Sequence, residues 1–97
     1  MTVGAAPPAI EFVLPNVLKP VAGRTSFELR AGTVREALEA AFAVVPVLRH
    51  HLTLPGGELR PHILCLVNGE SLLRDEAPGH ALRDGDEVRI HQAISGG

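Results

Sequence analysis

Hydrophobic and polar residues alternate along the first third of the chain in a way that predicts two β-strands. Residues 10–18 (IEFVLPNVL) are rich in β-forming side chains, and Pro15 within them is typical of an edge strand or a bulge. Residues 24–30 (RTSFELR) alternate between apolar and polar positions, as a half-buried strand does. Because residues 19–23 (KPVAG) have the composition of a turn, the two strands are expected to form a hairpin.

The next pattern repeats every three to four residues and predicts an amphipathic helix. Thr33 can cap the N-terminus of this helix, and Glu36, three positions later, completes a capping box. Pro46 is expected to end or kink the helix, and residues 47–52 to form a further helical turn. The apolar stripe of the helix consists of Val34, Leu38, Ala41, Phe42 and Val45.

Strand patterns return in the second half of the chain. Residues 62–67 (HILCLV) predict a strand that is apolar on both faces, typical of a central strand or of one that presents a face to a partner. The Asn68-Gly69 pair predicts a tight turn. We expect a short strand at Leu72-Leu73 and a last strand over residues 87–91 (EVRIH).

This order of elements predicts an α+β domain in which one main helix packs on a small mixed sheet (β-β-α-β-β). Residues 1–9 are expected to form a loose lead-in, residues 10–91 the folded domain and residues 92–97 a flexible tail. With 97 residues, the chain is long enough for one modest hydrophobic core.

Composition narrows the classes of function. Lys and Arg form no cluster, the net charge is −2, and Trp and Tyr are absent, which argues against a nucleic-acid partner. No apolar run approaches the roughly 18 residues that span a bilayer, so no membrane partner is expected. The single cysteine excludes an internal disulfide and fits a reducing cytoplasm, where we expect the protein to reside.

Several potentially reactive groups have simpler structural interpretations. Cys65 shares a strand face with apolar neighbours and is expected to be a buried thiol with a raised pKa. The acidic run Asp84, Asp86 and Glu87 is expected to be a solvated turn, and Gly56-Gly57, after a proline, a plain turn. No metal is expected, because ligand spacing is missing among the histidines His50, His51, His62, His80 and His91.

The sequence closes on Gly96-Gly97, directly after the last predicted strand. A chain end without side chains can enter a channel too narrow for a Cβ atom. An ATP-dependent activating enzyme can convert such a carboxylate into an acyl-adenylate. The alternative is a frayed terminus without a role.

Four stretches in this order resemble the ubiquitin-like β-grasp sulfur carriers. This family includes the small subunit of molybdopterin synthase, the thiamine sulfur carrier and a carrier used for cysteine synthesis. The stretches are TVREALEAAF (33–42), ELRPHILCLVNGE (58–70), LRDGDEVRI (82–90) and ISGG (94–97). The resemblance implies a ubiquitin-like β-grasp fold in which the last strand lies beside the first. Residues 14–23 (LPNVLKPVAG) look more like the cysteine-synthesis type than like the molybdopterin subunit.

The resemblance also implies a non-enzymatic carrier that binds no cofactor itself. An E1-like adenylyltransferase/sulfurtransferase would use ATP and Mg²⁺ to adenylate Gly97. A persulfide sulfur donor would then convert the adenylate to a thiocarboxylate for a sulfur-acceptor enzyme, in the synthesis of cysteine, molybdopterin, thiamine or a thiolated metabolite. The tail would consist of Ile94, Ser95 and Gly96, and the partner-docking residues would be Leu64, Leu66 and His91.

Two departures from the family pattern bear on the identity of the partners. The chain has His91-Gln92-Ala93 where the family often has L-P-P or L-P-A, and Leu66 where a bulky aromatic residue is common. Two other functions stay open. One is a ubiquitin-like modifier conjugated to lysines, which shares the adenylation step, and the other is a non-catalytic β-grasp interaction subunit whose glycines are incidental.

Overall fold

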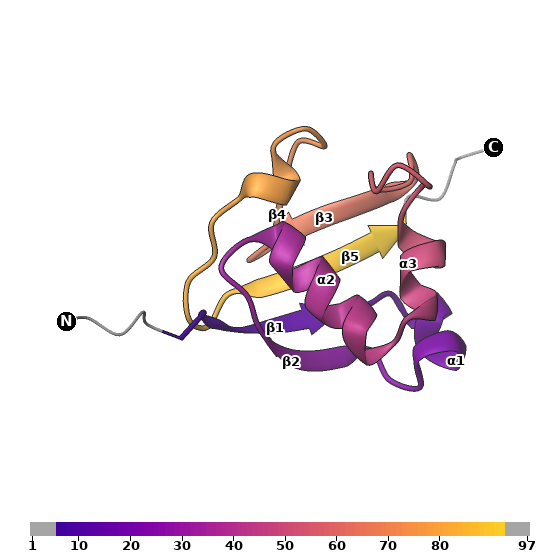
Figure 1. The fold of residues 1–97 in the computed structure, drawn as a ribbon, viewed down its shortest axis with the longest axis horizontal. Coiled ribbons are helices and arrows are strands. Elements are labelled where there is room, and N and C mark those ends of the chain that lie inside the picture. Colours follow the sequence, from indigo (N-terminus) through magenta and orange to yellow (C-terminus); the bar gives the residue numbers. More distant parts are fainter. Residues whose placement is uncertain (1–5, 93–97) are drawn as a thin grey trace.

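A five-stranded mixed sheet forms the centre of residues 6–92, the part of the chain that this computed structural model describes (Figure 1). The strand order is β2-β1-β5-β3-β4. β1 and β5 pair in parallel, which confirms that the last strand lies beside the first, and the other neighbours pair antiparallel. The strands are β1 (Ala9–Val13), β2 (Ser26–Arg30), β3 (Ile63–Val67), β4 (Glu70–Ser71) and β5 (Glu87–Gln92).

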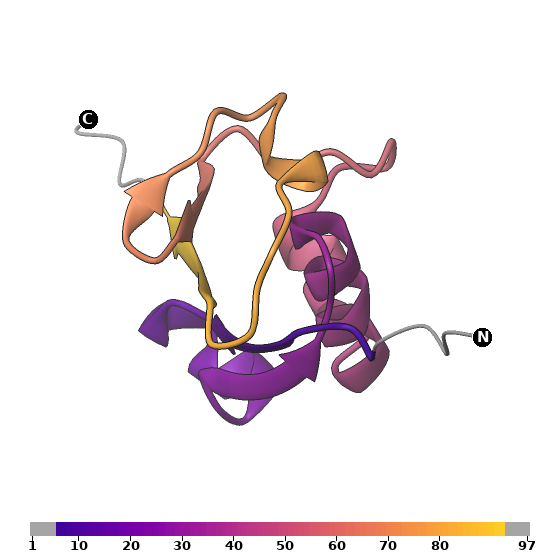
Figure 2. The ribbon, with the colours of Figure 1, turned by 90° about the vertical axis from the view of Figure 1, so that its left-hand side faces the viewer.

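Helix α2 (Val34–Val44) packs on one face of the sheet, as Figures 1 and 2 show. Its start is capped as predicted, because Thr33 Oγ1 accepts a hydrogen bond from the Glu36 N–H at 3.2 Å. The Glu36 carboxylate, however, accepts from the Gly32 N–H at 2.8 Å, one residue before the donor that a capping box uses. After Pro46, the predicted further turn forms helix α3 (Val47–Leu52).

The connection between β1 and β2 is not the tight turn that the sequence predicts. The strand ends at Val13, and a 3₁₀ helix, η1 (Asn16–Leu18), leads into helix α1 (Lys19–Ala22). The prediction of a strand to residue 18 followed by a short turn is therefore wrong. Pro15 has no N–H to offer a strand ladder, and the helical turn after it carries Leu18 into the core.

The short strand expected at Leu72-Leu73 is also wrong, because β4 is formed by the two residues before them. Asn68 (φ 52°) and Gly69 (φ 87°) make the predicted tight turn, so Val67 pairs directly with Glu70. Leu72 packs partly buried against the core instead. A second 3₁₀ helix, η2 (Ala77–Gly79), follows and lies against α2.

One hydrophobic core fills the space between the sheet and the helices. Phe12 and Phe27 from the first two strands meet the buried stripe of α2, and Val88 and Ile90 point inward from β5. A mixed sheet with one main helix on a single face is the predicted ubiquitin-like β-grasp arrangement. None of the helices within residues 6–92 is long and apolar enough to cross a bilayer.

The strands extend one residue beyond the expected domain limits of 10–91 at each end, to Ala9 and Gln92. The Ala9 N–H donates to Asp84 Oδ1 at 2.8 Å, and the Pro8 carbonyl accepts from the Ala31 N–H at 3.0 Å. The end of the expected lead-in is therefore tied to the domain. Residues 93–97, which include the expected reactive group on Gly97, lie outside the described residues.

Candidate partner-docking face

The predicted docking residues lie together on the face of the sheet opposite α2. Side chains alternate along β3, so the residues between its buried positions point away from the core. Leu64 is 38% exposed and Leu66 is half-buried. In the β3–β5 ladder, Leu64 lies opposite His91, and Leu66 opposite Arg89. Together with Val13, the residues Leu64, Leu66, Arg89 and His91 form the outer sheet face.

Arg89 and the buried Val13 complete this face, although the sequence-based prediction did not include them. Val13 pairs with Arg89 across the β1–β5 ladder, so Arg89 lies between an apolar residue on each side. The alternation that turns Val88 and Ile90 inward turns Arg89 outward, and this signal was available in the sequence. The position of Val13 depends on the strand pairing, which local sequence does not contain.

An ion pair between Arg89 and Glu87 lies at the centre of the outer sheet face and orients the Arg89 guanidinium. The Arg89 guanidinium donates from Nε to Glu87 Oε1 at 3.1 Å and from Nη2 to Glu87 Oε2 at 3.0 Å. This hydrogen bonding raises the pKa of Arg89, and the charge of Glu11 adds to the effect. A half-buried leucine beside an ordered, partly exposed ion pair is suited to recognition of a protein surface.

The outer sheet face is continuous with the start of the tail. Gln92 is the last residue of β5 and pairs with Ile63, the first residue of β3. His91 therefore precedes the end of the central strand by one position and lies beside Leu64. A partner that contacts this face is well placed to receive residues 93–97.

The acidic run has a structural role in the turn before β5. Asp86 accepts from Asn68 Nδ2 at 2.9 Å and from the Arg83 N–H at 2.8 Å, and Asn68 Oδ1 accepts from the Glu87 N–H at 2.9 Å. The Asn68 hydrogen bond, followed by that of Arg83, lowers the pKa of Asp86. These bonds tie the β3–β4 turn to the start of β5, so the run forms a turn as predicted.

Cys65 is buried, as the sequence predicts. Cys65 is only 2% exposed, and burial raises the pKa of its thiol to about 11. His50, His62 and His91 are exposed, and His51 and His80 are half-buried. Within residues 6–92, no group of three or more His, Cys, Asp or Glu side chains is arranged to hold a metal ion.

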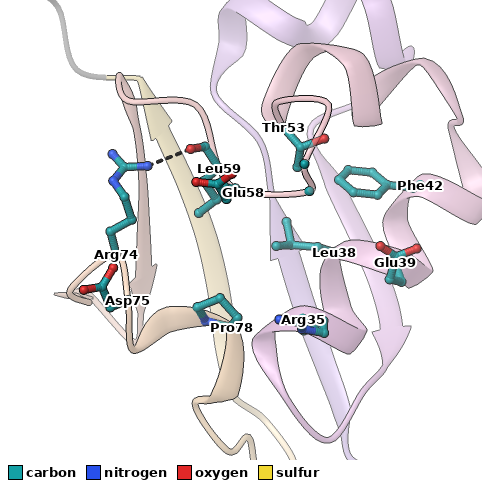
Figure 3. Close-up of a pocket in the computed structure, with 12 residues that line it drawn as sticks. Arg35, Leu38, Glu39, Phe42, Thr53, Glu58, Leu59, Arg74, Asp75 and Pro78 are labelled. Atoms are coloured by element: carbon teal, nitrogen blue, oxygen red, sulfur yellow. Dashed lines mark hydrogen bonds between the residues drawn. The ribbon is translucent and has the colours of Figure 1, made fainter.

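A separate groove of about 320 Å³ lies beside α2, between this helix and two loops (Figure 3). Its apolar lining includes Leu38, Phe42 and Pro78. In its wall, Arg74 holds the two loops together by donating to three backbone carbonyls, those of Leu59, Arg60 and Pro61. Every buried side-chain nitrogen and oxygen in the described part of the chain has a hydrogen-bond partner. The groove thus offers no unsatisfied buried polar group to a ligand.

A family model, a related sequence and solved structures all relate this chain to the same group of small proteins. The model of the ThiS family matches residues 13–97. Small archaeal modifier protein 1 of Haloferax volcanii is 38% identical over 65 residues, which cover 67% of this chain and 70% of the relative. The crystal structure of that modifier has a TM-score of 0.79 at 33% identity and covers 92% of this chain and 99% of the other.

Two further structures extend the likeness in fold. The solution structure of small archaeal modifier protein 1 from Methanosarcina acetivorans has a TM-score of 0.82 at 26% identity, covering 97% of this chain and all of the other (100%). A chain in the BexX/CysO complex of Amycolatopsis orientalis has a TM-score of 0.81 at 24% identity. The match covers 92% of this chain and 100% of the Amycolatopsis chain. The family match spans most of the sequence, and the sheet order and helix placement agree with it. The chain therefore belongs to the ThiS family of ubiquitin-like sulfur-carrier and modifier proteins.

Proposed function

We propose that this protein is a sulfur carrier whose Gly97 carboxylate is adenylated and then converted to a thiocarboxylate. The observation that supports the proposal most is the continuity between the outer sheet face and the tail. The family match runs through Gly97, and the strand that carries Arg89 and His91 leads directly into residues 93–97. One partner can therefore grip the sheet face and hold the tail in its active site.

The chemistry would take place in partner enzymes. A carboxylate is a poor electrophile, because it is anionic and its oxygens are poor leaving groups. An E1-like adenylyltransferase/sulfurtransferase would let the Gly97 carboxylate attack the α-phosphate of ATP, with pyrophosphate leaving, while Mg²⁺ offsets the phosphate charge. ATP and Mg²⁺ thus belong to the partner, and the carrier itself holds no cofactor.

Sulfur would enter in the next two steps. The terminal sulfur of a persulfide attacks the acyl carbon of Gly97, AMP leaves, and an acyl disulfide forms. A thiol then attacks the outer sulfur of this disulfide, which leaves the Gly97 thiocarboxylate and a mixed disulfide on the donor. The thiocarboxylate sulfur is a soft nucleophile that a sulfur-acceptor enzyme can direct at an electrophilic substrate.

The outer sheet face would provide the docking energy. Leu64 and Leu66 supply apolar area, and the Arg89–Glu87 ion pair between Leu66 and Val13, together with His91, supplies polar contacts. The segment formed by Ile94, Ser95 and Gly96 would pass through the partner's channel, with Ile94 as its apolar anchor. We place this pathway in the cytoplasm, with no role for nucleic acid or membrane.

The test is the intact mass of the chain after incubation with an activating enzyme, MgATP and a persulfide donor. We expect a gain equal to the exchange of one oxygen for sulfur, located at Gly97 by fragmentation. Addition of an oxygen to Met1 or Cys65 changes the mass almost equally, so fragmentation is needed to assign the site. A chain with a C-terminal amide is the matched control and should not gain sulfur. If an enzyme adenylates the chain that has its natural C-terminal carboxylate, but this chain gains no sulfur, the proposal is contradicted.

A second candidate function is that of a protein modifier. It is favoured by the 38% identity to a relative that is named a modifier. The same Gly97 adenylate would then react with lysine amines of other proteins instead of with a persulfide. Tagged chain in cell extract would give covalent conjugates that resist reducing agents, whereas a pure sulfur carrier would give none.

A further inference from the structure

We propose that the protein that docks on the outer sheet face inserts a basic side chain between Glu11 and Glu28, in a hollow over β1 and β2. The inference rests on the proposed function, because the docking protein is the activating enzyme of that proposal. It adds the charge that this enzyme must present and a second contact region, at the opposite end of β5 from the tail.

The hollow lies on the same side of the sheet as the outer sheet face. It is open, has a volume of about 630 Å³, and is lined in part by Glu11 and Glu28. Phe12, which follows Glu11, and Phe27, which precedes Glu28, are buried in the core. Because successive side chains of a strand point to opposite faces, both glutamates point away from the core, and both are exposed. A side chain of a docked protein can therefore reach them.

The register of the β1–β2 ladder brings the two glutamates as close together as a sheet allows. Glu11 lies directly opposite Glu28. Three positions further along the ladder, the Leu14 N–H donates to the Thr25 carbonyl at 2.7 Å, so that pair is hydrogen-bonded. Since bonded and non-bonded pairs alternate, Glu11 and Glu28 form a non-hydrogen-bonded pair, with Cα atoms about 4.5 Å apart. Like charges at such a position destabilise a sheet.

No cation of the described chain neutralises this pair. Within residues 6–92, no Lys, Arg or His side-chain nitrogen lies within 4.0 Å of a carboxylate oxygen of Glu11 or Glu28. Glu11 accepts a hydrogen bond at 2.6 Å from Ser26 Oγ, which is neutral. Arg30 also lines the hollow, but its Nη1 donates to the Pro7 carbonyl at 3.0 Å. The repulsion is thus left for a partner to relieve.

The negative charge of the hollow continues into the outer sheet face. Across the β1–β5 ladder, Glu11 lies opposite Glu87, whose carboxylate binds Arg89. Three carboxylates in a row therefore share one guanidinium, and this excess of negative charge complements a basic partner surface. Glu87 begins β5 and Gln92 ends it, about 17 Å away at the rise of a strand. A partner that contacts the hollow and receives the tail is therefore fixed in orientation.

Arginine meets the requirement of the hollow best. Its planar guanidinium carries five N–H donors and can bind both carboxylates at once, whereas a lysine ammonium acts as a single point charge. Hydrogen bonds between ionised groups are stronger than those between neutral groups. The contact would also remove the repulsion between Glu11 and Glu28, so a feature that destabilises the free chain would strengthen the complex.

The experiment measures pyrophosphate release by the activating enzyme with MgATP, at rising concentrations of the full chain and at two salt concentrations. Glu28→Gln removes one charge and keeps the shape of the side chain. We expect its KM to rise at least about fivefold at low salt and by less at high salt, with little change in kcat, because charges of this kind act on association. Its free energy of unfolding in urea should not fall, since the repulsion is relieved.

Glu76→Gln is the matched control. It makes the same change in net charge, but Glu76 is exposed and lies outside the sheet, so KM should stay as in the wild type. The double variant Glu11→Gln, Glu28→Gln should raise KM further than Glu28→Gln alone.

Three outcomes would overturn the inference while leaving the proposed adenylation intact. They are an unchanged KM in the double variant, an equal rise of KM in Glu76→Gln, and a fall of kcat in Glu28→Gln without a rise of KM. Absence of pyrophosphate release with the wild-type chain would instead contradict the proposed function and, with it, this inference.

Discussion

Leu66 on β3 lies directly opposite Arg89 on β5, on the face of the sheet that α2 leaves uncovered. Arg89 is held in place by Glu87, and Val13 lies on its other side. The pair thus combines an apolar contact with an oriented cation at the centre of the proposed docking surface. Arg89 also lies on β5, the strand that leads into the tail, whereas Leu66 on β3 is half-buried, so substitutions at this pair can separate docking from folding.

Leu66→Arg should weaken binding to the activating enzyme by at least about tenfold, or ~1.4 kcal/mol. The new guanidinium would face Arg89, and like charges on opposite strands cost only up to about 1 kcal/mol of stability. Calorimetric titration gives the affinity and urea unfolding the stability. Leu73→Arg is the matched control, because Leu73 is 69% exposed and lies outside the outer sheet face. Global unfolding of Leu66→Arg would show that Leu66 belongs to the core.

Removing Gly97, or adding a residue after it, should abolish sulfur transfer without altering the fold. The reacting carboxylate would be moved by one residue in a partner site that positions it, while no described contact would change. Transfer of radiolabelled sulfur measures the first effect, and a proton–nitrogen correlation spectrum the second. If the shortened chain still accepts sulfur, Gly97 is not the residue that receives it and the proposed carrier chemistry is wrong.

Asn68→Asp should destabilise the fold near neutral pH by placing a second carboxylate beside that of Asp86. The deficit relative to wild type should shrink on acidification, because protonating one carboxyl group removes the repulsion. Urea unfolding from pH 7 down to pH 3 measures this. Asn68→Gly, which accepts the φ of 52° and adds no charge, should show a deficit with much weaker pH dependence. Equal pH profiles for the two variants would contradict the prediction.

The lowered pKa of Asp86 gives the wild type its own acid dependence. The unfolded chain takes up a proton at this carboxyl group before the folded chain does, so stability falls as pH drops below the ordinary range of about 4. Asn68→Gly removes the main cause of the shift and should flatten this part of the profile. If the stability of this variant falls at low pH as steeply as that of the wild type, carboxylates other than Asp86 cause the fall.

Cys65 should resist iodoacetamide in the folded protein and react on unfolding. Its thiol is buried and has a pKa of about 11, against about 8.5 in an unfolded chain. The unfolded chain therefore loses this proton first, and stability should fall as pH rises from about 8.5 to about 11. Cys65→Ala should lose this alkaline slope, although it is less stable because of the cavity it creates.

The low reactivity of the Cys65 thiol in the folded protein also allows alkylation to be used as a test for a Gly97 thiocarboxylate. In native wild-type protein treated with the sulfur donor, only a Gly97 thiocarboxylate should be alkylated rapidly. Alkylation mapped to Cys65 under native conditions would contradict the burial that the structure assigns to this thiol.

The sequence by itself determined the features that depend on neighbouring residues. Thr33 caps α2 with its own side chain, the Asn68-Gly69 pair turns the chain because both positions tolerate positive φ, and alternation sets which residues of β3 and β5 face inward. Motif order also sufficed for the fold class and the family. The roles of Ile94 to Gly97 stay predictions, since these residues lie outside the described part of the chain.

Only the tertiary structure decided the features that depend on distant partners. Residues 19–22 form a helix instead of a turn because Val21 and Ala22 pack against the core in this conformation. Leu72 lies outside a strand for the same reason, because it also packs against the core. Val13 joins Arg89 only through a strand pairing between residues 76 apart in sequence, and Leu66 joins Arg89 through a pairing between residues 23 apart. Local chemistry fixes turns, caps and faces, whereas burial against remote segments decides which of them come together.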